Sequence, residues 1–308
     1  MRLRTFVALL AMLLIATAAP AVAADKLIIG VALHPYYSWA LNIVGDRAEV
    51  RTVIPPDSDP HSYQPRAEDL ANLSNLDVVI FNGLGHDQYL EQMIQAAGRT
   101  DMPLIRPNQG LPLIPVFRET YELVDGKPQI RQHTAYNSHS YIAILGAIQQ
   151  INTIARELGN LDPPNASYYR SNARAYNRRL RNMLGNALDK INEIDAAGTT
   201  LATVHDGYAY LFQELGLNVS AVIQPRHGIE PSARQLADTI EQIKSKGITI
   251  LFAELDYDKK YVDIIFQETG CRIYQLSHIS HGEFSPEKFE RDMQANLDSI
   301  IKALSEAR

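Results

Sequence analysis

Residues 161–195 read LDPPNASYYRSNARAYNRRLRNMLGNALDKINEID, and this stretch decides the architecture of the chain. Asp162 followed by Pro163 and Pro164 is typical of a helix start, because proline is pre-set for the first helical turn. Beyond this start, apolar side chains recur at steps of three and four, which predicts one long amphipathic helix ending near residue 195. At about 1.5 Å per residue, such a helix reaches across two ordinary domains. The predicted apolar stripe consists of Ala166, Tyr169, Ala173, Tyr176, Leu180, Met183, Ala187, Ile191 and Ile194.

On both sides of this helix, short β-branched runs alternate with segments of helical period. This alternation is typical of parallel sheets that carry helices on both faces. The predicted fold is therefore α/β, with two Rossmann-like lobes, each a mainly parallel sheet flanked by helices, joined by one long rigid helix. The predicted domains are an N-terminal lobe at 25–160, the linking helix at 161–196 and a C-terminal lobe at 197–308. Residues 115–138 break the alternation and predict a surface loop or hairpin.

The N-terminus has the pattern of a secretory signal peptide over residues 1–24. Arg2 and Arg4 precede a short apolar run, and small residues follow at a cleavage site after Ala23 or Ala24. No later run is long and apolar enough to predict a membrane span. The single cysteine, Cys271, lies far from the cleavage site, so neither a lipid-bearing N-terminal cysteine nor an intramolecular disulfide is expected. The sequence therefore predicts a periplasmic protein that is not a lipoprotein.

The charge balance excludes two classes of partner. The chain carries 29 basic and 35 acidic residues, and without Arg2 and Arg4 the basic count is 27. An acidic surface argues against binding to nucleic acid or to anionic membrane surfaces. We expect a monomer whose ligand is a cation.

Three histidines occupy similar local settings. His61 lies between two prolines in the stretch Asp59–Pro65, just beyond a predicted strand, so its backbone is stiff. His139 lies where a loop gives way to a helix, and His205 directly follows a predicted strand. Ligands of open α/β sheets bind beyond the carboxyl ends of the strands, so these imidazoles can converge in the cleft between the lobes. Three neutral imidazoles suit Zn²⁺ and other borderline first-row metal ions.

Several segments, in the same order, resemble the zinc/manganese substrate-binding proteins of bacterial ABC importers. They are Ile54–Pro65 (IPPDSDPHSYQP), Leu76–Gly85 (LDVVIFNGLG), Val204–Tyr208 (VHDGY), Glu230–Ala233 (EPSA) and Leu251–Glu254 (LFAE). The resemblance covers nearly the whole chain after the signal peptide. It implies metal capture in the cleft and delivery to a cognate ABC permease in the inner membrane.

The resemblance also implies which residues hold the metal. His61, His139 and His205 match three of the family's ligand positions. A histidine at the third position is similar to the zinc-preferring members, which implies Zn²⁺ as the cargo and makes Mn²⁺ the lesser alternative. The family's late carboxylate is missing, because Ser277 stands there. His278 is assigned as the fourth ligand, with His281, Glu254 or water as alternatives.

Two other histidines receive supporting roles. His86, near the predicted cleft mouth, is expected behind the metal ligands, and His34 is expected to be structural.

Two further functions remain open from the residues alone. Three histidines and a water molecule form a catalytic type of zinc shell, with Glu254 as a general base, so a zinc-dependent hydrolase is one alternative. A siderophore- or haem-binding protein on the same fold is the other, supported by Tyr36, Tyr37, Trp39 and Tyr63. The sequence contains neither an HExxH pair nor a nucleophile-elbow arrangement, so we do not expect an enzyme.

Overall fold

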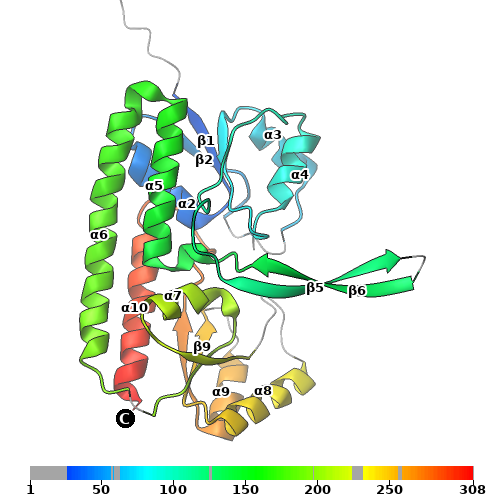
Figure 1. Ribbon diagram of the computed structural model, residues 1–308, viewed down its shortest axis with the longest axis vertical. Helices are drawn as coiled ribbons and strands as arrows, with labels where there is room; N and C mark the ends of the chain where they lie inside the picture. Colours follow the sequence, from blue (N-terminus) through cyan, green and yellow to red (C-terminus); the bar gives the residue numbers. More distant parts are fainter. Residues whose placement is uncertain are drawn as a thin grey trace, which may run out of the picture.

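Two parallel sheets, one in each half of the chain, confirm the predicted α/β fold (Figure 1). The computed structural model describes residues 26–56, 58, 63–124, 127–196, 198–223, 232–255 and 259–307, and for 118–124, 127, 128 and 130 it describes the backbone alone. In this part of the chain each of the two sheets has four strands. In spatial order the first sheet contains β2 (Glu49–Thr52), β1 (Ile28–Val31), β3 (Val78–Ile80) and β4 (Leu104–Ile105). The second contains β8 (Val219–Val222), β7 (Leu201–Thr203), β9 (Ile250–Glu254) and β10 (Arg272–Leu276).

The two sheets share one topology. When the strands of each sheet are numbered along the chain, both have the spatial order 2-1-3-4, and all neighbours are parallel. In such sheets the crevice beside the first strand, where the order reverses, is the usual ligand site. Each lobe therefore supplies one set of carboxyl strand ends to a potential site.

The helices follow the predicted alternation. Their bounds are α2 (His34–Val44), α3 (Ala67–Leu73), α4 (Tyr89–Ala96), α5 (Ile144–Leu161), α6 (Ala166–Asn192), α7 (Ala209–Glu214), α8 (Ala233–Lys246), α9 (Lys259–Thr269) and α10 (Lys288–Glu306), with 3₁₀ turns η1 (Ser140–Ile142), η2 (Pro163–Asn165) and η3 (Asp206–Tyr208). α2 begins at His34 with Pro35 in its first turn, where the fixed φ of proline suits a helix. β4 was not predicted, because two residues are too few to show the sequence pattern of a strand.

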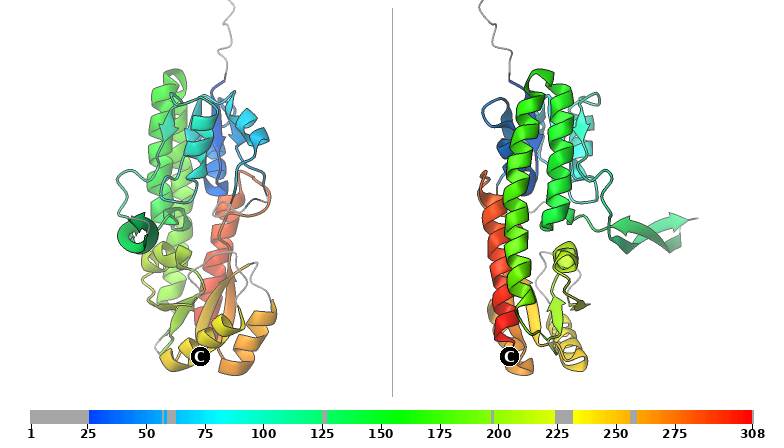
Figure 2. Two further views of the ribbon diagram at one scale, coloured as in Figure 1. Left: turned by 90° about the vertical axis from the view of Figure 1, so that its right-hand side faces the viewer. Right: turned by 60° about the vertical axis from the view of Figure 1, so that its left-hand side comes forward.

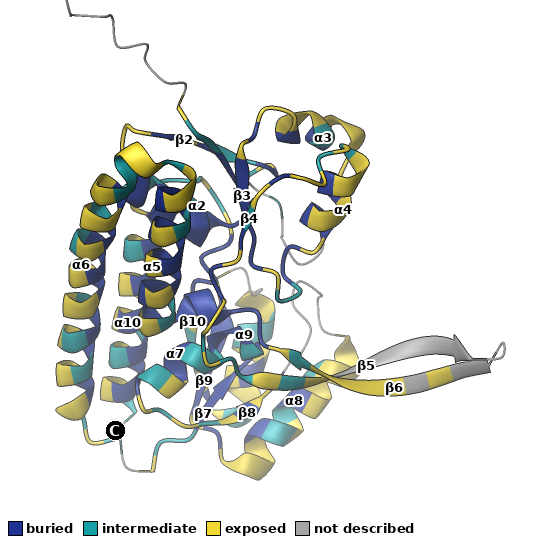
Figure 3. Cartoon of the chain, turned by 45° about the horizontal axis from the view of Figure 1, so that its top comes forward, coloured by how far each residue is buried: buried dark blue, intermediate teal, exposed yellow. Residues whose placement is uncertain are grey.

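One apolar core joins the two lobes. It contains side chains from both sheets, such as Val31 and Phe252, together with those of the helical layer formed by α2, α5, α6 and α10. Separate apolar clusters lie between the first sheet and α3 and α4, and between the second sheet and α8 and α9. Figure 3 shows the buried faces of these helices turned toward the sheets. The lobes are therefore fixed to a common layer of helices.

α6 is the predicted long helix, and it runs alongside both lobes (Figures 1 and 2). Most of its stripe is buried as expected, with Tyr169, Tyr176 and Leu180 at most 1% exposed, while Ala166, Met183 and Ile194 are half-buried. On its other side Arg179 forms an ion pair with Glu290 of α10, with 2.9 Å between Nε and Oε1. The division of the chain at 160 and 196 stays a prediction, and the structure adds that α10 at the chain's end packs along α6 and against α2.

The segment predicted as a loop or hairpin is a hairpin. β5 (Pro115–Val124) and β6 (Lys127–Tyr136) pair only with each other among the described strands, with Phe117 opposite Thr134. Figure 2 shows this ribbon projecting away from the body of the molecule. Its base leads directly into the segment that carries His139.

We find no described helix with both the length and the apolar character required to cross a bilayer.

Candidate metal centre

Four histidines and one glutamate meet between the two sheets. His86, His139 and His278 each offer one ring nitrogen within 4.8 Å of the other two, and His205, Glu254 and His278 meet the same criterion. All five side chains are buried, and we refer to them as the cluster. Imidazole nitrogens and carboxylate oxygens are the ligands that Zn²⁺ and neighbouring first-row ions accept.

The fold brings the cluster together at the carboxyl ends of strands. His86 lies in the loop after β3, and His205 follows β7 by two residues. Glu254 is the last residue of β9, and His278 lies two residues beyond β10. His139 immediately precedes the 3₁₀ turn η1, after the hairpin. The topology therefore predicts this meeting point, with both sheets directing their strand ends toward it.

Asn137 sets the orientation of His139. Its side-chain oxygen accepts hydrogen bonds from the backbone N–H of His139 (3.0 Å) and from ring Nδ1 (2.8 Å). An amide oxygen only accepts, so Nδ1 carries the proton and Nε2 carries the lone pair of the neutral ring. The amide nitrogen of Asn137 also donates to the backbone oxygen of Asp206 (2.9 Å) in the second lobe. One side chain thus fixes the tautomer of an imidazole in the cluster and links the lobes.

The segment around His278 is fixed by a hydrogen-bonded support from α10. Asn296 accepts from the backbone N–H of Ser277 (2.6 Å) and donates to its carbonyl oxygen (2.8 Å). The hydroxyl of Ser277 donates to Asp292 (3.1 Å), and Lys288 forms a buried ion pair with Asp292 (2.9 Å). Ser277 is therefore a structural residue here, which explains why the neighbouring His278 reaches the cluster.

The residue after His278 has an unusual backbone. Ile279 has φ of 60°, in the left-handed region that β-branched residues avoid. This turn places His278 beside Tyr141, with 3.4 Å between the hydroxyl and Nδ1, while the Ser280 hydroxyl lies 3.0 Å from the same nitrogen. The other ring nitrogen, Nε2, is therefore the one directed at the remaining cluster residues.

Residues 282–290 are clamped to α2. The ring of His34 stacks on Phe284 with centroids 3.8 Å apart, and its Nε2 lies 2.6 Å from the carbonyl oxygen of Gly282. Ser38 donates to the carbonyl oxygen of Ser285 (2.7 Å). Burial lowers the pKa of His34 from 6.5 to about 4, so the ring is neutral at pH 7. The predicted structural role of His34 agrees with this packing.

The residues predicted from the sequence as metal ligands differ in where the structure places them. The structure brings His139, His205 and His278 together, while His61 lies outside the described residues. Glu254, one of the alternatives for the fourth ligand, also lies in the cluster. His281 is exposed and hydrogen-bonds Ser280 through its Nδ1 (3.0 Å).

His86 was expected behind the metal ligands, and the structure places it within the cluster. It is 1% exposed, and its Nε2 lies 2.7 Å from the hydroxyl of Tyr141. Gly83 and Gly85 precede it with positive φ, which turns the loop after β3 toward the cluster. The signal in the sequence was a histidine that follows two glycines beyond the end of a strand.

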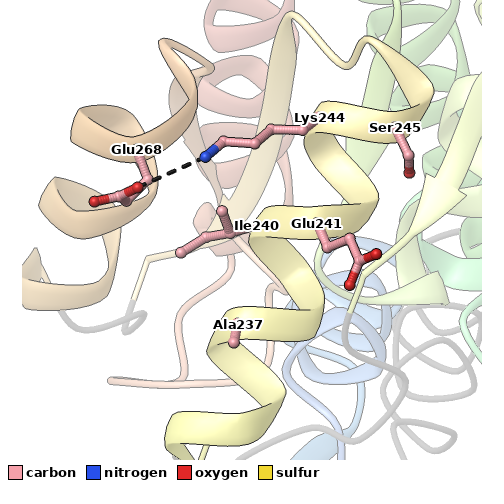
Figure 4. Close-up of a pocket in the computed structure, with 6 residues that line it drawn as sticks. All are labelled: Ala237, Ile240, Glu241, Lys244, Ser245 and Glu268. Atoms are coloured by element: carbon pink, nitrogen blue, oxygen red, sulfur yellow. Dashed lines mark ion pairs between the residues drawn. The ribbon is translucent and has the colours of Figure 1, made fainter.

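A pocket on the surface of the second lobe is lined by apolar and charged side chains. It lies between α8 and α9 and is lined by Ile240, Lys244 and Glu268, with an ion pair of 3.6 Å between the last two (Figure 4). This pocket contains no histidine among its lining residues. Among the described residues, groups of three or more potential metal ligands within 4.8 Å of one another occur at the cluster alone.

Solved structures of the same fold include metal-bound proteins. The SBP FpvC from Pseudomonas aeruginosa in complex with a Ni²⁺ ion has a TM-score of 0.81 and 44% identity, covering 92% of this chain and 98% of FpvC. FpvC in complex with Mn²⁺ has a TM-score of 0.82 and 45% identity, covering 92% of this chain and all of that one. These likenesses support both the fold and a common ancestry.

Sequence relatives with curated names bind or import metals. The chain is 23% identical over 286 residues to the high-affinity zinc uptake system protein ZnuA of Bacillus subtilis, covering 91% of this chain and 88% of ZnuA. It is 24% identical over 272 residues to the manganese ABC transporter substrate-binding lipoprotein PsaA of Streptococcus mitis, covering 86% and 84%. The names of these relatives thus include both of the metals that the resemblance implied.

One expectation is contradicted by these relatives. We predicted a periplasmic protein that is not a lipoprotein, from the lack of a cysteine near the predicted cleavage site. PsaA, and likewise MntA and SloC, are named as lipoproteins, so relatives of this chain do carry lipid anchors. The prediction was wrong, because the lack of a cysteine near the predicted cleavage site does not suffice to exclude a lipid anchor. That segment also lies outside the residues that the structure describes.

A family model provides the broadest comparison. The model described as "Zinc-uptake complex component A periplasmic" matches residues 29–303, which include both sheets except Ile28 and every described member of the cluster. The fold, the strand-end histidines and this match agree. The chain belongs to the ZnuA family of metal-binding substrate-binding proteins of ABC transporters.

Proposed function

We propose that this protein binds one divalent transition-metal ion at the cluster, with Zn²⁺ as the cargo, and delivers it to a cognate ABC permease. The observation that carries the proposal is the convergence of His139, His205, His278 and Glu254 from separate strand ends into one buried centre. Buried carboxylates are paired or coordinate metals, and Glu254 is 8% exposed with its Oε1 3.5 Å from His205 Nδ1. A divalent cation at this centre would balance the carboxylate.

The donor set favours borderline metal ions over hard ones. Imidazole suits Zn²⁺, Ni²⁺ and Cu²⁺ better than Mn²⁺, and affinity for a nitrogen-rich site rises along the first row. That Ni²⁺ and Mn²⁺ both occupy the related FpvC supports a centre that accepts several ions. We therefore propose that the centre selects Zn²⁺ by binding it more tightly than Mn²⁺.

The size of the adjoining cavity supports an ion as cargo. A cavity of about 100 Å³ borders His278, Glu254 and Lys288. Sites for organic ligands of drug size occupy about 300–1,000 Å³. A haem or a siderophore would require a larger opening, so the ion is the better candidate. We further propose that the protein acts as a monomer and has no enzymatic activity.

The test is a calorimetric titration of chelator-treated protein with Zn²⁺, together with metal analysis of the protein as purified. We expect one ion per chain, and at least about 10-fold weaker binding in His139→Ala and in His61→Ala, the predicted ligand outside the described residues. His133→Ala, on the exposed part of the hairpin, is the matched control and should bind as the unsubstituted protein does.

Two results would contradict the proposal. One is the absence of stoichiometric binding of any divalent first-row ion. The other is zinc-dependent hydrolysis of a generic ester that is lost in Glu254→Gln, which would favour the hydrolase.

A further inference from the structure

Four arginines lie on one exposed side of the long helix α6. They are Arg170, Arg174, Arg178 and Arg181, and we refer to them as the arginine row. At about 3.6 residues per turn, these positions fall within about 80° of one another around the helix axis, and they extend over about 16 Å along it. We infer that the arginine row is a docking surface for an acidic helix of another protein.

The charge of α6 differs from that of the whole chain. The helix contains six basic residues and one acidic residue, whereas the chain has 29 basic and 35 acidic residues. Outside the row, the basic residues of α6 are Arg179 and Lys190, and its acidic residue, Asp189, lies about two turns beyond Arg181. The row is therefore a local concentration of positive charge on a protein with an excess of acidic side chains.

The arginines of the row are not neutralised by the chain itself. Among the described residues, none of the four forms a hydrogen bond or an ion pair. Other arginines on the surface do form such pairs: Arg106 lies 3.0 Å from Glu91, and Arg179 lies 2.9 Å from Glu290. Like charges three or four residues apart destabilise a helix slightly. The described part of the chain thus leaves this repulsion uncompensated, and carboxylates of a partner would relieve it.

The outer side of α6 is accessible to a partner. Figures 1 and 2 show α6 at the margin of the molecule, with no other described element over its outer side. The opposite side of the helix, which includes Tyr169 and Tyr176, packs into the apolar core. The core therefore lies between the arginine row and the cluster. A partner bound at the row does not contact the metal centre.

The residue type and the spacing both indicate carboxylates on a helix. All four residues are arginine, and a guanidinium group binds a carboxylate through two parallel hydrogen bonds, which an ammonium group cannot do. The steps from Arg170 to Arg174 and from Arg174 to Arg178 each correspond to a rise of about 6 Å. Acidic residues four apart on a second α-helix have the same rise, so two helices lying side by side keep their charges in register.

An anionic membrane surface fits these observations less well. Helices that bind at a membrane surface combine a basic face with apolar side chains that enter the lipid. Between Arg170 and Arg181, a segment that is described throughout, no large apolar side chain is exposed, because Tyr176 and Leu180 are buried. The chain also has a net charge of −6, so anionic lipids would repel the rest of the protein.

The probe for this surface is a labelled helical peptide with glutamates at i, i+4, i+8 and i+11 and otherwise neutral residues. Its binding is followed by fluorescence anisotropy. We expect a variant carrying Arg170→Gln, Arg174→Gln, Arg178→Gln and Arg181→Gln to bind it at least about 10-fold more weakly, because four exposed ion pairs are lost. Binding to the unsubstituted protein should also weaken as salt rises from about 0.02 M to about 0.3 M.

A second variant removes the same amount of charge from another surface. It carries Lys244→Gln, Lys246→Gln, Lys259→Gln and Lys260→Gln, all at exposed positions of α8 and α9. We expect it to bind the peptide within about twofold of the unsubstituted protein, because the charges that it loses are not on the row. Thermal unfolding of both variants shows that they are folded, and the salt dependence needs no variant.

Four results would overturn the inference. They are no binding of the peptide, equal binding of a peptide with the same glutamates spread around its helix, an equal loss in the lysine variant, and tighter binding to vesicles of phosphatidylglycerol and phosphatidylethanolamine than to the peptide. A Zn²⁺ titration keeps the inference separate from the proposed function, since the arginine variant should bind Zn²⁺ as the unsubstituted protein does. A protein that binds the peptide but no metal would overturn the proposed function alone.

Discussion

Gly207 lies against His205 so closely that a β-carbon at this position would be 2.6 Å from the ring nitrogen Nδ1. A real β-carbon does not approach a nitrogen at this distance, and the short His205 side chain can yield only by leaving its place. We therefore expect Gly207→Ala to weaken metal binding by about 10-fold or more, measured by calorimetry. Gly185→Ala, on α6 with open space around its α-carbon, is the control and should leave binding unchanged. Equal binding by Gly207→Ala and the unsubstituted protein would show that the ring can move at no cost.

A substitution at Asn137 should also weaken metal binding indirectly, through the orientation of His139. Replacement by Ala removes the acceptor for His139 Nδ1 and the donor to the Asp206 carbonyl. We expect metal affinity to fall by about 10–100-fold, as is usual when the partner of a ligating histidine is lost. Asn160→Ala, whose side chain bonds only Glu157 among the described contacts, is the comparison. If both variants bind metal equally, the orientation of His139 does not depend on this amide.

The packing of His34 against Gly282 and Phe284 predicts that the free energy of unfolding depends on pH. The folded-state pKa of about 4 lies below the ordinary 6.5, because burial disfavours the charged ring more strongly than the Gly282 carbonyl favours it. The neutral His34 ring therefore makes its full contribution to the free energy of unfolding above pH 6.5. This contribution is lost as the pH falls toward 4, at up to about 1.4 kcal/mol per pH unit. Urea unfolding of the metal-free protein between pH 7.5 and 4.5 measures this slope.

His34→Phe isolates the contribution of this ring. It keeps an aromatic ring for stacking on Phe284 and removes the titrating group. We expect a shallower loss of stability with acid than in the unsubstituted protein or in His133→Phe. Parallel pH profiles for all three proteins would rule out His34 as the source.

Glu214 joins the lobes at the start of α5. Its two carboxylate oxygens accept from the backbone N–H groups of Ile144 (2.8 Å) and Leu145 (2.6 Å), so a side chain of α7 caps a helix of the other lobe. Glu214→Ala leaves both N–H groups without this acceptor, and we expect a loss of about 1–2 kcal/mol in the free energy of unfolding. Gln213→Ala, the neighbouring exposed residue, should change it by less than about 0.5 kcal/mol. Similar values for the two would mean that water replaces the cap.

The hairpin should be removable without loss of the metal centre. Phe117 and Thr134 face each other in the ribbon, so residues 118–133 can be replaced by an Asn-Gly turn. Because β5 and β6 pair only with each other among the described strands, we expect metal affinity to stay within about twofold. Calorimetry with Zn²⁺ checks this, and a large loss would show that the ribbon supports Asn137 and His139.

The fold was predictable because its strands and helices have clear periods. The α6 stripe appeared at steps of three and four, and the core strands were short β-branched runs, so local pattern and tertiary packing agree. β4 is too short to carry such a pattern. The start of α2 at His34 depended on the conformational preference of Pro35, which the apolar period alone does not express.

Two members of the cluster were predictable because each histidine borders a regular element. His139 immediately precedes the 3₁₀ turn η1, and His205 lies between β7 and the 3₁₀ turn η3. The role of His86 depends on a loop turned inward by two glycines with positive φ, and that of Glu254 on which face of β9 meets the other lobe. Both are properties of the assembled fold, and residue order alone does not contain them.

The left-handed backbone at Ile279 has a cost that the rest of the molecule must offset. A β-branched residue in this region loses about 1–3 kcal/mol relative to a relaxed turn, and the loop keeps this shape because Asn296 and Asp292 bind the neighbouring Ser277. The protein thus gives up some folding stability so that His278 points inward before any ion arrives. An ion at the proposed centre would meet an imidazole already in position, and little of its binding free energy would be spent on ordering the loop.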